Sequence, residues 1–345
     1  MQLPREVVVG NDTLSMLPQI CKKLDLCESA LVVTGPETNN IAGRMVIDLL
    51  RDEHMVVESF VVNSPTLWEV KAVEQKIAEM KPRVVLGVGG GTKIDVAKLS
   101  STGQGVPFIS VPTTASHDGI ASPVAAVKGL GKPYSVMAQS PMAIVADTDI
   151  IIRSDYRFTA SGCGDLVSKF TSVRDWELAF KERNEYYGEY AASLALMSAR
   201  LVAKNADVIK PQSDEGLRLV LEALISCGVA MSIAGSSKPC SGSEHLFSHA
   251  LDLVEPNGSL HGEQCGVGTI MMAYLYNIDW KGIKETLQKT GAPTTAEELC
   301  VSSESVIKAL VMARTIRPER YTILDTQKLD EHSAEKLAKV TGVIQ

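Results

Sequence analysis

One stretch of the chain reads Val84-Val85-Leu86-Gly87-Val88-Gly89-Gly90-Gly91-Thr92-Lys93-Ile94-Asp95. Its first residues are apolar and β-branched, which is typical of a buried strand, and its last residues open a helical pattern. Glycines between a strand and a helix let the backbone turn sharply and present its N–H groups to an anion at the positive end of the helix dipole. The stretch therefore predicts an α/β domain with a phosphate-binding turn.

The glycine cluster matches neither of two common nucleotide motifs. Thr92 stands where the dinucleotide fingerprint G-x-G-x-x-G has its third glycine. A Walker A loop is excluded as well, because no glycine directly precedes Lys93 and Ile94 replaces its Ser or Thr. Taken alone, the cluster is also compatible with a tight strand-to-helix turn that binds no ligand.

The composition is that of a large globular protein. With 345 residues, of which 45% are hydrophobic and 22% are charged, the chain can bury an extensive core and is expected to form two domains. Its net charge of -7 argues against nucleic acids and anionic membranes as partners. We find no run of 18 apolar residues and no apolar signal segment near the start, which predicts a cytoplasmic protein without stable membrane insertion.

Seven cysteines are scattered through the chain and form no CxxC pair. Such spacing does not suit a disulfide framework or a zinc–thiolate site. We therefore expect reduced thiols, which agrees with a cytoplasmic location.

The first part of the chain alternates strand-like and helix-like segments. Strands are predicted at residues 5–9, 30–34, 56–62, 83–88, 107–111 and 143–146. Helical patterns lie between them, including residues 41–51 and 68–80, the second of which follows a capping signal at Thr66. This alternation predicts βαβ units and a mostly parallel, Rossmann-like sheet with ligands at the carboxyl ends of its strands.

The second part is expected to be helical. Helical patterns are predicted at residues 186–207, 214–234, 244–254 and 265–277, with more toward residue 345. Between the two parts, strand-like sequence gives way to the polar residues Arg153-Ser154-Asp155. We therefore predict a dinucleotide-binding domain at residues 1–152, an all-helical metal-binding domain at residues 153–345, and an active site in the cleft between them.

A second polar stretch, Val111-Pro112-Thr113-Thr114-Ala115-Ser116-His117-Asp118-Gly119, follows the strand at residues 107–111. Its Thr and Ser hydroxyls can bind a phosphate or a ribose, and it should leave the same edge of the sheet as the glycine cluster. Asp118 would direct a carboxylate toward whatever binds beside the nucleotide. The local sequence is equally compatible with an Asx turn at this residue.

Three of the six histidines, His245, His249 and His261, fall within 17 residues. The first two are spaced i,i+4, which places them on one face of a helix. His261 follows the turn-forming residues Glu255-Pro256-Asn257-Gly258, so the chain can fold back and bring this imidazole to the pair. Asp165, expected to begin a helix, can add a carboxylate. One Asp with two His suits Zn²⁺, although Fe²⁺, Ni²⁺ or Co²⁺ would also fit, and isolated histidines can simply be hydrogen-bonded residues.

Five motifs together resemble the superfamily of iron-containing alcohol dehydrogenases, glycerol dehydrogenases and dehydroquinate synthases. They are the glycine cluster at 89–95, the polar stretch at 111–119, Gly162-Cys163-Gly164-Asp165, Gly242-Ser243-Glu244-His245-Leu246-Phe247-Ser248-His249 and Leu260-His261-Gly262-Glu263. The motifs occur in the order that the superfamily shows, and the resemblance covers essentially the whole chain. Within the superfamily they are most similar to the archaeal sn-glycerol-1-phosphate dehydrogenase family.

This resemblance implies a reversible reduction of dihydroxyacetone phosphate to sn-glycerol 1-phosphate, the starting point of archaeal ether lipids. NAD or NADP would carry the hydride. Which of the two is preferred stays open, because the sequence does not show whether Glu37, beyond the strand at residues 30–34, faces the ribose 2′-hydroxyl. The resemblance also implies one Zn²⁺ per subunit and a homo-oligomer.

Individual residues acquire roles from the same resemblance. Asp165, His245 and His261 resemble the metal ligands. Asp118, Asp165 and His249 resemble the residues that meet the substrate and carry catalysis. The cofactor would be held by Gly90, Gly91, Thr92, Lys93, Ile94, Asp95, Thr113, Thr114, Ala115 and Ser116, with Ser122 near the nicotinamide. Lys169 stands where iron-dependent members have a further histidine ligand, which places the chain with the three-ligand zinc branch.

Other functions remain compatible with these residues. A dehydrogenase of unphosphorylated polyols such as glycerol would use the same machinery, and the sequence does not decide whether Lys169, His117 or another basic residue binds a substrate phosphate. A lyase of the dehydroquinate synthase kind, or a silent nucleotide-binding protein, is a further alternative. The first metal ligand of the synthases is a glutamate, so Asp165 argues against a synthase.

Overall fold

The computed structural model describes residues 2–129, 132–256 and 258–345. Six strands form one parallel sheet in the order β1-β8-β5-β4-β2-β3. Their bounds are Glu6–Gly10 (β1), Ser29–Thr34 (β2), Val56–Val61 (β3), Val84–Gly89 (β4), Phe108–Pro112 (β5) and Ala143–Asp147 (β8). The six predicted strands and the parallel α/β sheet are therefore confirmed.

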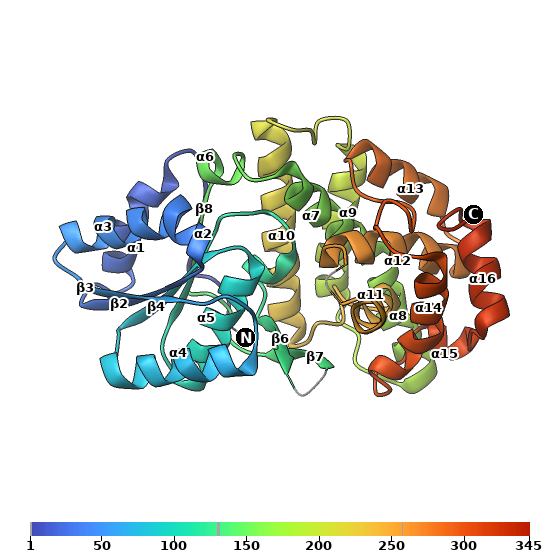
Figure 1. Ribbon diagram of the computed structural model, residues 1–345, viewed down its shortest axis with the longest axis horizontal. Helices are drawn as coiled ribbons and strands as arrows, with labels where there is room; N and C mark the ends of the chain where they lie inside the picture. Colours follow the sequence, from blue (N-terminus) through green and yellow to red (C-terminus); the bar gives the residue numbers. More distant parts are fainter. Residues whose placement is uncertain (1, 130–131, 257) are drawn as a thin grey trace.

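Helices cover both faces of the sheet (Figure 1). Helices α1 (Leu17–Lys23) and α3 (Arg44–Asp52) lie on one face, and α4 (Leu67–Met80) and α5 (Gly91–Gly103) lie on the other. The alternation of side chains along β2 explains this, because Ala30 and Val32 join one buried core while Leu31 and Val33 join the other. The remaining short helices of this half are η1 (Thr13–Met16), α2 (Pro36–Thr38), η2 (Asn39–Gly43), η3 (Asp118–Ile120) and α6 (Thr148–Ile151).

A hairpin that the sequence did not predict projects from this half. Strands β6 (Val124–Gly129) and β7 (Lys132–Met137) pair antiparallel and form a second, two-stranded sheet. Glycine and proline are depleted in strands, and Gly129 and Pro133 lie within this hairpin. The segment therefore carries no clear strand pattern.

The second half is helical throughout its described residues, as predicted. Its helices are α7 (Tyr156–Val167), α8 (Lys169–Arg183), α9 (Glu189–Lys204), α10 (Asp214–Ala234), α11 (Ser243–Val254), α12 (His261–Leu275), α13 (Trp280–Lys289), α14 (Ser303–Ile316), α15 (Ile323–Gln327) and α16 (Glu331–Val340). The division of the chain after residue 152 stays a prediction.

Two helices begin earlier than the sequence suggested. Asp165 was expected to begin a helix, but it lies in the last turn of α7, because the Asp155 carboxylate caps that helix by accepting a hydrogen bond of 2.9 Å from the backbone N–H of Arg157. Helix α12 was expected from residue 265 and begins at His261. The side chain of Glu263 accepts a hydrogen bond from the backbone N–H of Leu260, the residue before the helix. Asn257 of the expected turn lies outside the described residues.

Helix α10 lies between the two halves of the molecule (Figure 1). By length and composition alone it could cross a membrane, but 61% of its most apolar 18-residue stretch is buried inside the protein. It contacts β1 and η3 of the first half as well as α7 and α9 of the second half. Helix α10 is therefore an interior helix of the fold.

Candidate active site

The glycine cluster and the polar stretch at residues 111–119 leave the sheet side by side. Strands β4 and β5 are neighbours, and Gly89 at the end of one pairs with Pro112 at the end of the other. Gly89 has a φ of 154°, a backbone conformation that residues with a side chain rarely adopt. Gly90 then precedes the first turn of α5, so the unpaired N–H groups of this helix face the space beyond the strand ends.

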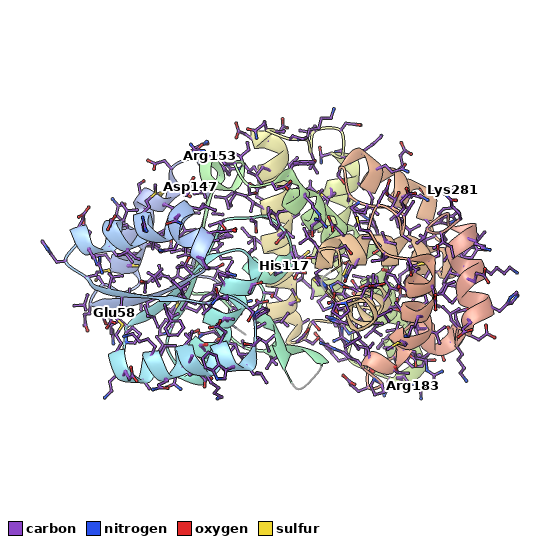
Figure 2. All side chains as sticks on the ribbon, in the orientation of Figure 1. Glu58, His117, Asp147, Arg153, Arg183 and Lys281 are labelled. Atoms are coloured by element: carbon purple, nitrogen blue, oxygen red, sulfur yellow. The ribbon has the colours of Figure 1, made fainter. Side chains whose placement is uncertain are left out.

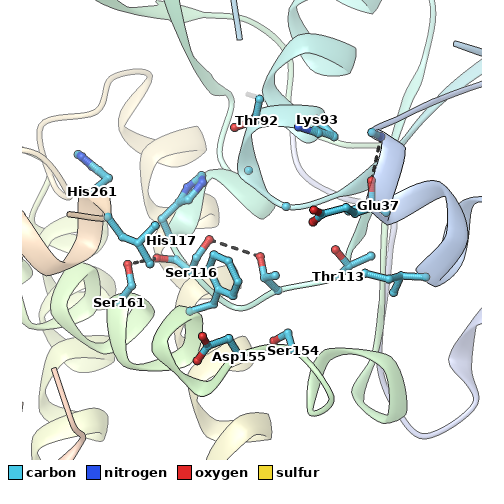
Figure 3. Close-up of a pocket in the computed structure, with 18 of the residues that line it drawn as sticks. Glu37, Thr92, Lys93, Thr113, Ser116, His117, Ser154, Asp155, Ser161 and His261 are labelled. Carbon is cyan, nitrogen blue, oxygen red and sulfur yellow. Dashed lines mark hydrogen bonds between the residues drawn. The ribbon is translucent and has the colours of Figure 1, made fainter. Parts of the chain in front are cut away.

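A cleft of about 1130 Å³ opens at this edge of the sheet (Figure 3). Most predicted cofactor residues line it: Gly90, Gly91, Thr92, Lys93, Thr113, Thr114 and Ser116. Ser154 and Asp155 lie across the cleft from Thr92 and Lys93 (Figure 3). The volume exceeds the roughly 300–1,000 Å³ of ordinary small-ligand pockets, as a dinucleotide requires. Ile94 and Ala115 are fully buried and line no described cavity.

A smaller cavity of about 210 Å³ adjoins the cleft. The two share Gly91, Thr92, His117 and His261 in their walls. His117 lies between the two halves of the molecule (Figure 2). The smaller cavity is lined by Asp95, Asp118, Ser122, His245 and His249, all of them predicted site residues. A cofactor in the cleft and a small molecule in this cavity would therefore be in contact.

Two of the predicted metal ligands face each other beside the smaller cavity. His245 Nε2 lies 3.6 Å from Asp165 Oδ1, a separation that a metal ion with bonds of about 2.0–2.2 Å can span. The other ring nitrogen of His245 lies 2.9 Å from Glu244 Oε1, and His261 Nδ1 lies 3.0 Å from the Ser248 hydroxyl. Partners of this kind orient the imidazoles and leave each Nε2 available for a metal.

Glycines allow the helices that carry two of the predicted metal ligands to pack closely. A Cβ on Gly162 of α7 would lie 2.1 Å from the carbonyl oxygen of Ala115, and a Cβ on Gly164 would lie 2.2 Å from the carbonyl oxygen of Gly262. Helices α7 and α12 therefore meet backbone to backbone. This contact brings the backbone next to Asp165, at Gly164, close to the backbone next to His261, at Gly262.

Cys265 is a neighbour that the sequence did not point to. Its Sγ lies 3.6 Å from His261 Nε2, and its thiol and the side-chain nitrogens of His245 and His261 lie within 4.8 Å of one another. Burial raises the pKa of the Cys265 thiol well above its usual value, which favours the neutral form. In the sequence, the i,i+4 spacing between His261 and Cys265 could have indicated that the two side chains are neighbours.

Lys169 connects two of the predicted catalytic carboxylates. Its ammonium nitrogen lies 2.7 Å from Asp165 Oδ1 and 2.9 Å from Asp118 Oδ2, and the backbone N–H of Asp118 donates to Asp165 Oδ2 at 2.7 Å. Burial tends to raise the pKa of Asp165, but the positive charge of Lys169 holds it well below its usual range. Burial likewise opposes the charge of Lys169, yet the two carboxylates raise its pKa well above the usual value. Lys169 is fully buried and lines neither cavity, so its ammonium group does not face a ligand in either of them.

His249 presents a buried nitrogen that has no partner in the described parts of the chain. This nitrogen, Nδ1, makes no hydrogen bond, and the ring stacks at 5.7 Å on His261. Burial, followed by the charges of His261 and Arg317, lowers the pKa of His249 well below 6.5. The imidazole is therefore neutral at pH 7, and it can both donate and accept a proton.

Comparison with known proteins identifies the family. Residues 8–154 match the family model described as iron-containing alcohol dehydrogenase. Over 344 residues the chain is 54% identical to the glycerol-1-phosphate dehydrogenase [NAD(P)+] of Pyrococcus furiosus, with 100% of this chain and 99% of that protein covered. The chain belongs to the glycerol-1-phosphate dehydrogenase family. The Methanosarcina mazei protein of the same name is 53% identical over 344 residues, covering 100% and 96% of the two chains.

Solved structures more distant than these glycerol-1-phosphate dehydrogenases have the same fold. Glycerol dehydrogenase from Schizosaccharomyces pombe superimposes with a TM-score of 0.81 at 22% identity, covering 98% of this chain and 89% of that one. A probable glycerol dehydrogenase from Sinorhizobium meliloti gives a TM-score of 0.78 at 18% identity, covering 99% and 98%. The fold predicted from the sequence is therefore confirmed.

In this glycerol-1-phosphate dehydrogenase family member, a second buried lysine joins α5 to segments beside the smaller cavity. Lys98 Nζ lies 3.1 Å from Asp95 Oδ1 and donates to the carbonyl oxygens of Gly119, at 2.8 Å, and Val124, at 2.7 Å. Asp95 Oδ2 accepts from the backbone N–H of Ala126 at 3.0 Å. The Lys98–Asp95 ion pair therefore joins α5 to η3 and to the β6–β7 hairpin. Sequence reasoning missed Lys98, although its i,i+3 spacing from Asp95 was visible.

Proposed function

We propose that the protein catalyses the reversible, NAD(P)-dependent reduction of dihydroxyacetone phosphate to sn-glycerol 1-phosphate. Full-length identity of 54% to a glycerol-1-phosphate dehydrogenase [NAD(P)+] supports this reaction. The structural observation that best supports it is that the cavity beside Asp165 and the histidines adjoins the dinucleotide-sized cleft. The product would supply the glycerophosphate backbone of ether lipids.

We further propose that Asp165, His245 and His261 hold one Zn²⁺. The residues fit such an ion, because one ionised carboxylate and two oriented, neutral imidazoles form the donor set of an open zinc site. A bound Zn²⁺ supplies Lewis acidity that stabilises negative charge developing on the carbonyl oxygen of the substrate. Cys265 would remain a neighbouring thiol outside this set.

The protein's own side chains position the substrate. The Asp118 carboxylate is fixed by Lys169 and faces the smaller cavity, so it can accept a hydrogen bond from a substrate hydroxyl. His249 is neutral and its Nδ1 has no partner among the described residues, so it can exchange a proton with the bound ligand. Because Lys169 and Asp165 are buried, the charges around the substrate act in a site from which water is largely excluded.

The cofactor would bind along the cleft. We propose that the N–H groups after Gly90 and the hydroxyls of Thr113, Thr114 and Ser116 hold its diphosphate. Glu37 and Lys93 lie at the end of the cleft next to β2, where a Rossmann-like fold places the adenosine ribose (Figure 3). These two side chains would then decide the preference between NAD and NADP.

We also propose a cytoplasmic homo-oligomer. Two observations support this. The seven cysteines are all free, as in a reducing compartment. Apolar side chains of Tyr186, Tyr190 and Met197, which are 70%, 72% and 57% exposed, lie in or just before α9 and offer a surface for a second subunit.

A spectrophotometric assay tests the reaction. Oxidation of NADH and NADPH is followed with dihydroxyacetone phosphate and with dihydroxyacetone, before and after chelation and return of zinc. We expect zinc-dependent turnover that strongly favours the phosphate ester. Turnover of dihydroxyacetone alone would indicate a glycerol-type polyol dehydrogenase. No oxidation with either ketone would contradict the dehydrogenase proposal.

A further inference from the structure

Two buried thiols meet beside the smaller cavity. Cys227 lies in α10, and Cys240 lies in the loop between α10 and α11. The Sγ atom of Cys240 lies 3.5 Å from the carbonyl oxygen of Cys227, and both thiols are buried and free of disulfides. Cys240 also lines the cavity. The two cysteines are 13 positions apart in the sequence, a spacing from which this approach was not predicted.

The Asp118 carboxylate completes a group of three possible metal ligands. The sulfur atoms of Cys227 and Cys240 and one carboxylate oxygen of Asp118 all lie within 4.8 Å of one another. Two metal–ligand bonds of about 2.0–2.3 Å span up to about 4.6 Å, so one ion could join these atoms after small shifts. Lys169 contacts Oδ2 of Asp118, and a carboxylate has a second oxygen to offer. None of the three residues belongs to the ligand set proposed for the catalytic zinc.

Backbone contacts hold this group in place from two sides. A Cβ on Gly228, which follows the cysteine of α10, would lie 2.5 Å from the carbonyl carbon of Ala121, so α10 packs directly against the end of η3. The hydroxyl of Ser172 donates at 2.9 Å to the carbonyl oxygen of Pro239, which precedes the cysteine of the loop. The three donors are therefore brought together by the fold itself, which lowers the entropy cost of binding an ion.

The donor types select the kind of ion. Thiolates bind soft and borderline cations such as Cd²⁺ and Zn²⁺, whereas Mg²⁺ and Ca²⁺ prefer oxygen ligands. Thiols lose their protons when a metal binds. A divalent ion that replaces one proton on each of the two thiols therefore adds no net charge beside the buried Lys169. Because Cys240 and Asp118 line the cavity, a water molecule there can serve as a fourth ligand.

We infer that Cys227, Cys240 and Asp118 form a second metal site, which takes a thiophilic divalent cation and inhibits the enzyme when it is filled. The binding part of the inference stands on the geometry of these three residues. The inhibitory part rests on the proposed function, in which Asp118 accepts a hydrogen bond from a substrate hydroxyl. A cation at the second site would engage this carboxylate and compete with the substrate. Zinc should therefore activate the enzyme at one equivalent per chain and inhibit it in excess.

Absorption spectroscopy tests the site without reference to turnover. Cd²⁺ is titrated into enzyme that already holds one zinc per chain, and the ultraviolet charge-transfer band of cadmium–thiolate bonds is followed. We expect the band in the wild type and its loss in Cys227→Ser and Cys240→Ser. Cys163→Ser should keep it and is the matched control, because Cys163 is also fully buried but belongs to no group of possible metal ligands among the described residues.

Cys265→Ser shows whether cadmium has instead entered the catalytic site, since Cys265 is the thiol beside His245 and His261. The band should persist in this variant. Absence of the band from the wild type would overturn the second site whether or not the serine variants fold. Loss of the band only in Cys265→Ser would overturn it as well.

Steady-state kinetics measures the inhibition. At free Zn²⁺ about ten times the dissociation constant of the second site, competition should raise the apparent KM for dihydroxyacetone phosphate about tenfold in the wild type. In Cys227→Ser the same zinc concentration should raise it less than about twofold. A thiolate band without this rise in KM would overturn the inhibitory role. If the wild type reduces neither ketone but shows the band, the proposed function fails and the metal site stands.

Discussion

Lys169 and Asp165 form a buried ion pair in which the ammonium nitrogen lies 2.7 Å from Oδ1 of the carboxylate. Asp118 faces the same ammonium group, so one cation compensates two carboxylates. Replacing Lys169 by methionine would leave these carboxylates unpaired in a site with little water. We expect Lys169→Met to lower the free energy of unfolding by about 3–5 kcal/mol, measured by denaturant titration.

Lys98→Met provides the comparison, because Lys98 is also fully buried but pairs with Asp95, which is not one of the proposed metal ligands. Zinc should reduce the difference in unfolding free energy between Lys169→Met and the wild type, since a bound cation can replace part of the missing charge. The deficit of Lys98→Met should not depend on zinc. A Lys169→Met deficit that is the same with and without zinc would place the metal elsewhere.

Metal content distinguishes the proposed Asp165 ligand from the nearby thiol. The thiol of Cys265 lies 3.6 Å from His261 Nε2, and Cys265 forms a group with both His245 and His261. Asp165 approaches His245 at 3.6 Å but does not belong to that group. We expect Asp165→Asn to lose zinc after dialysis against a mild chelator, and Cys265→Ser and His249→Gln to retain about one zinc per chain. Elemental analysis measures this. Loss of zinc from Cys265→Ser with retention in Asp165→Asn would reverse the assignment.

The backbone contact at Gly162 should tolerate no side chain. A Cβ at this residue would lie 2.1 Å from the Ala115 carbonyl oxygen, which belongs to the polar stretch after β5. We expect Gly162→Ala to cost about 1–3 kcal/mol of unfolding free energy and to weaken zinc binding as well. Gly258→Ala is the control, because its nearest neighbour would be 3.4 Å away. Equal stability of the two variants would show that α7 can shift without cost.

Acid should destabilise the metal-free protein partly through His249. Its pKa is held well below 6.5 in the folded state by burial, then by His261 and Arg317. Below about pH 6.5 the unfolded chain therefore binds a proton that the folded chain does not, so stability falls as the pH falls. In His249→Gln this fall should be shallower by about 1.4 kcal/mol per pH unit, measured by urea unfolding between pH 7 and 5. The exposed His332→Gln is the control, and parallel curves for His249→Gln and wild type would contradict the expectation.

Cofactor preference should respond to the two charges beside β2. Glu37 is exposed at the cleft, and its carboxylate acts on the partly buried ammonium of Lys93. We expect Glu37→Gln to raise kcat/KM for NADPH relative to NADH by about two- to fivefold, because a charge that repels the 2′-phosphate is lost. Lys93→Gln should shift the ratio in the opposite direction. Shifts of both variants in one direction would place the adenosine ribose elsewhere.

The sequence predicted what depends on short-range pattern. The strand from Val84 and the glycines after it are recognisable because apolar runs and turn residues act within a few positions. The spacing of His245 and His249 similarly defines one face of a helix. These features account for the sheet, for most of the helical half and for the residues around the smaller cavity.

What the sequence did not reveal depends on contacts between distant residues. Lys169 acquires its role only when Asp118, about fifty positions earlier, folds against α8. Arg320 belongs to no spacing pattern with Ser237, and only the packed structure shows that its guanidinium donates a hydrogen bond to that hydroxyl. The β6–β7 hairpin was missed because Gly129 and Pro133, which are residue types depleted in strands, interrupt its valines.

The interior position of α10 affects how the chain can be made. Its surroundings include β1 and η3, which are encoded nearly a hundred residues or more upstream. During synthesis those elements leave the ribosome first, and domains commonly begin to fold from the N-terminus. An apolar helix that could otherwise aggregate or enter a lipid bilayer thus emerges when part of its docking surface already exists. The order of translation would thus protect this long, apolar helix.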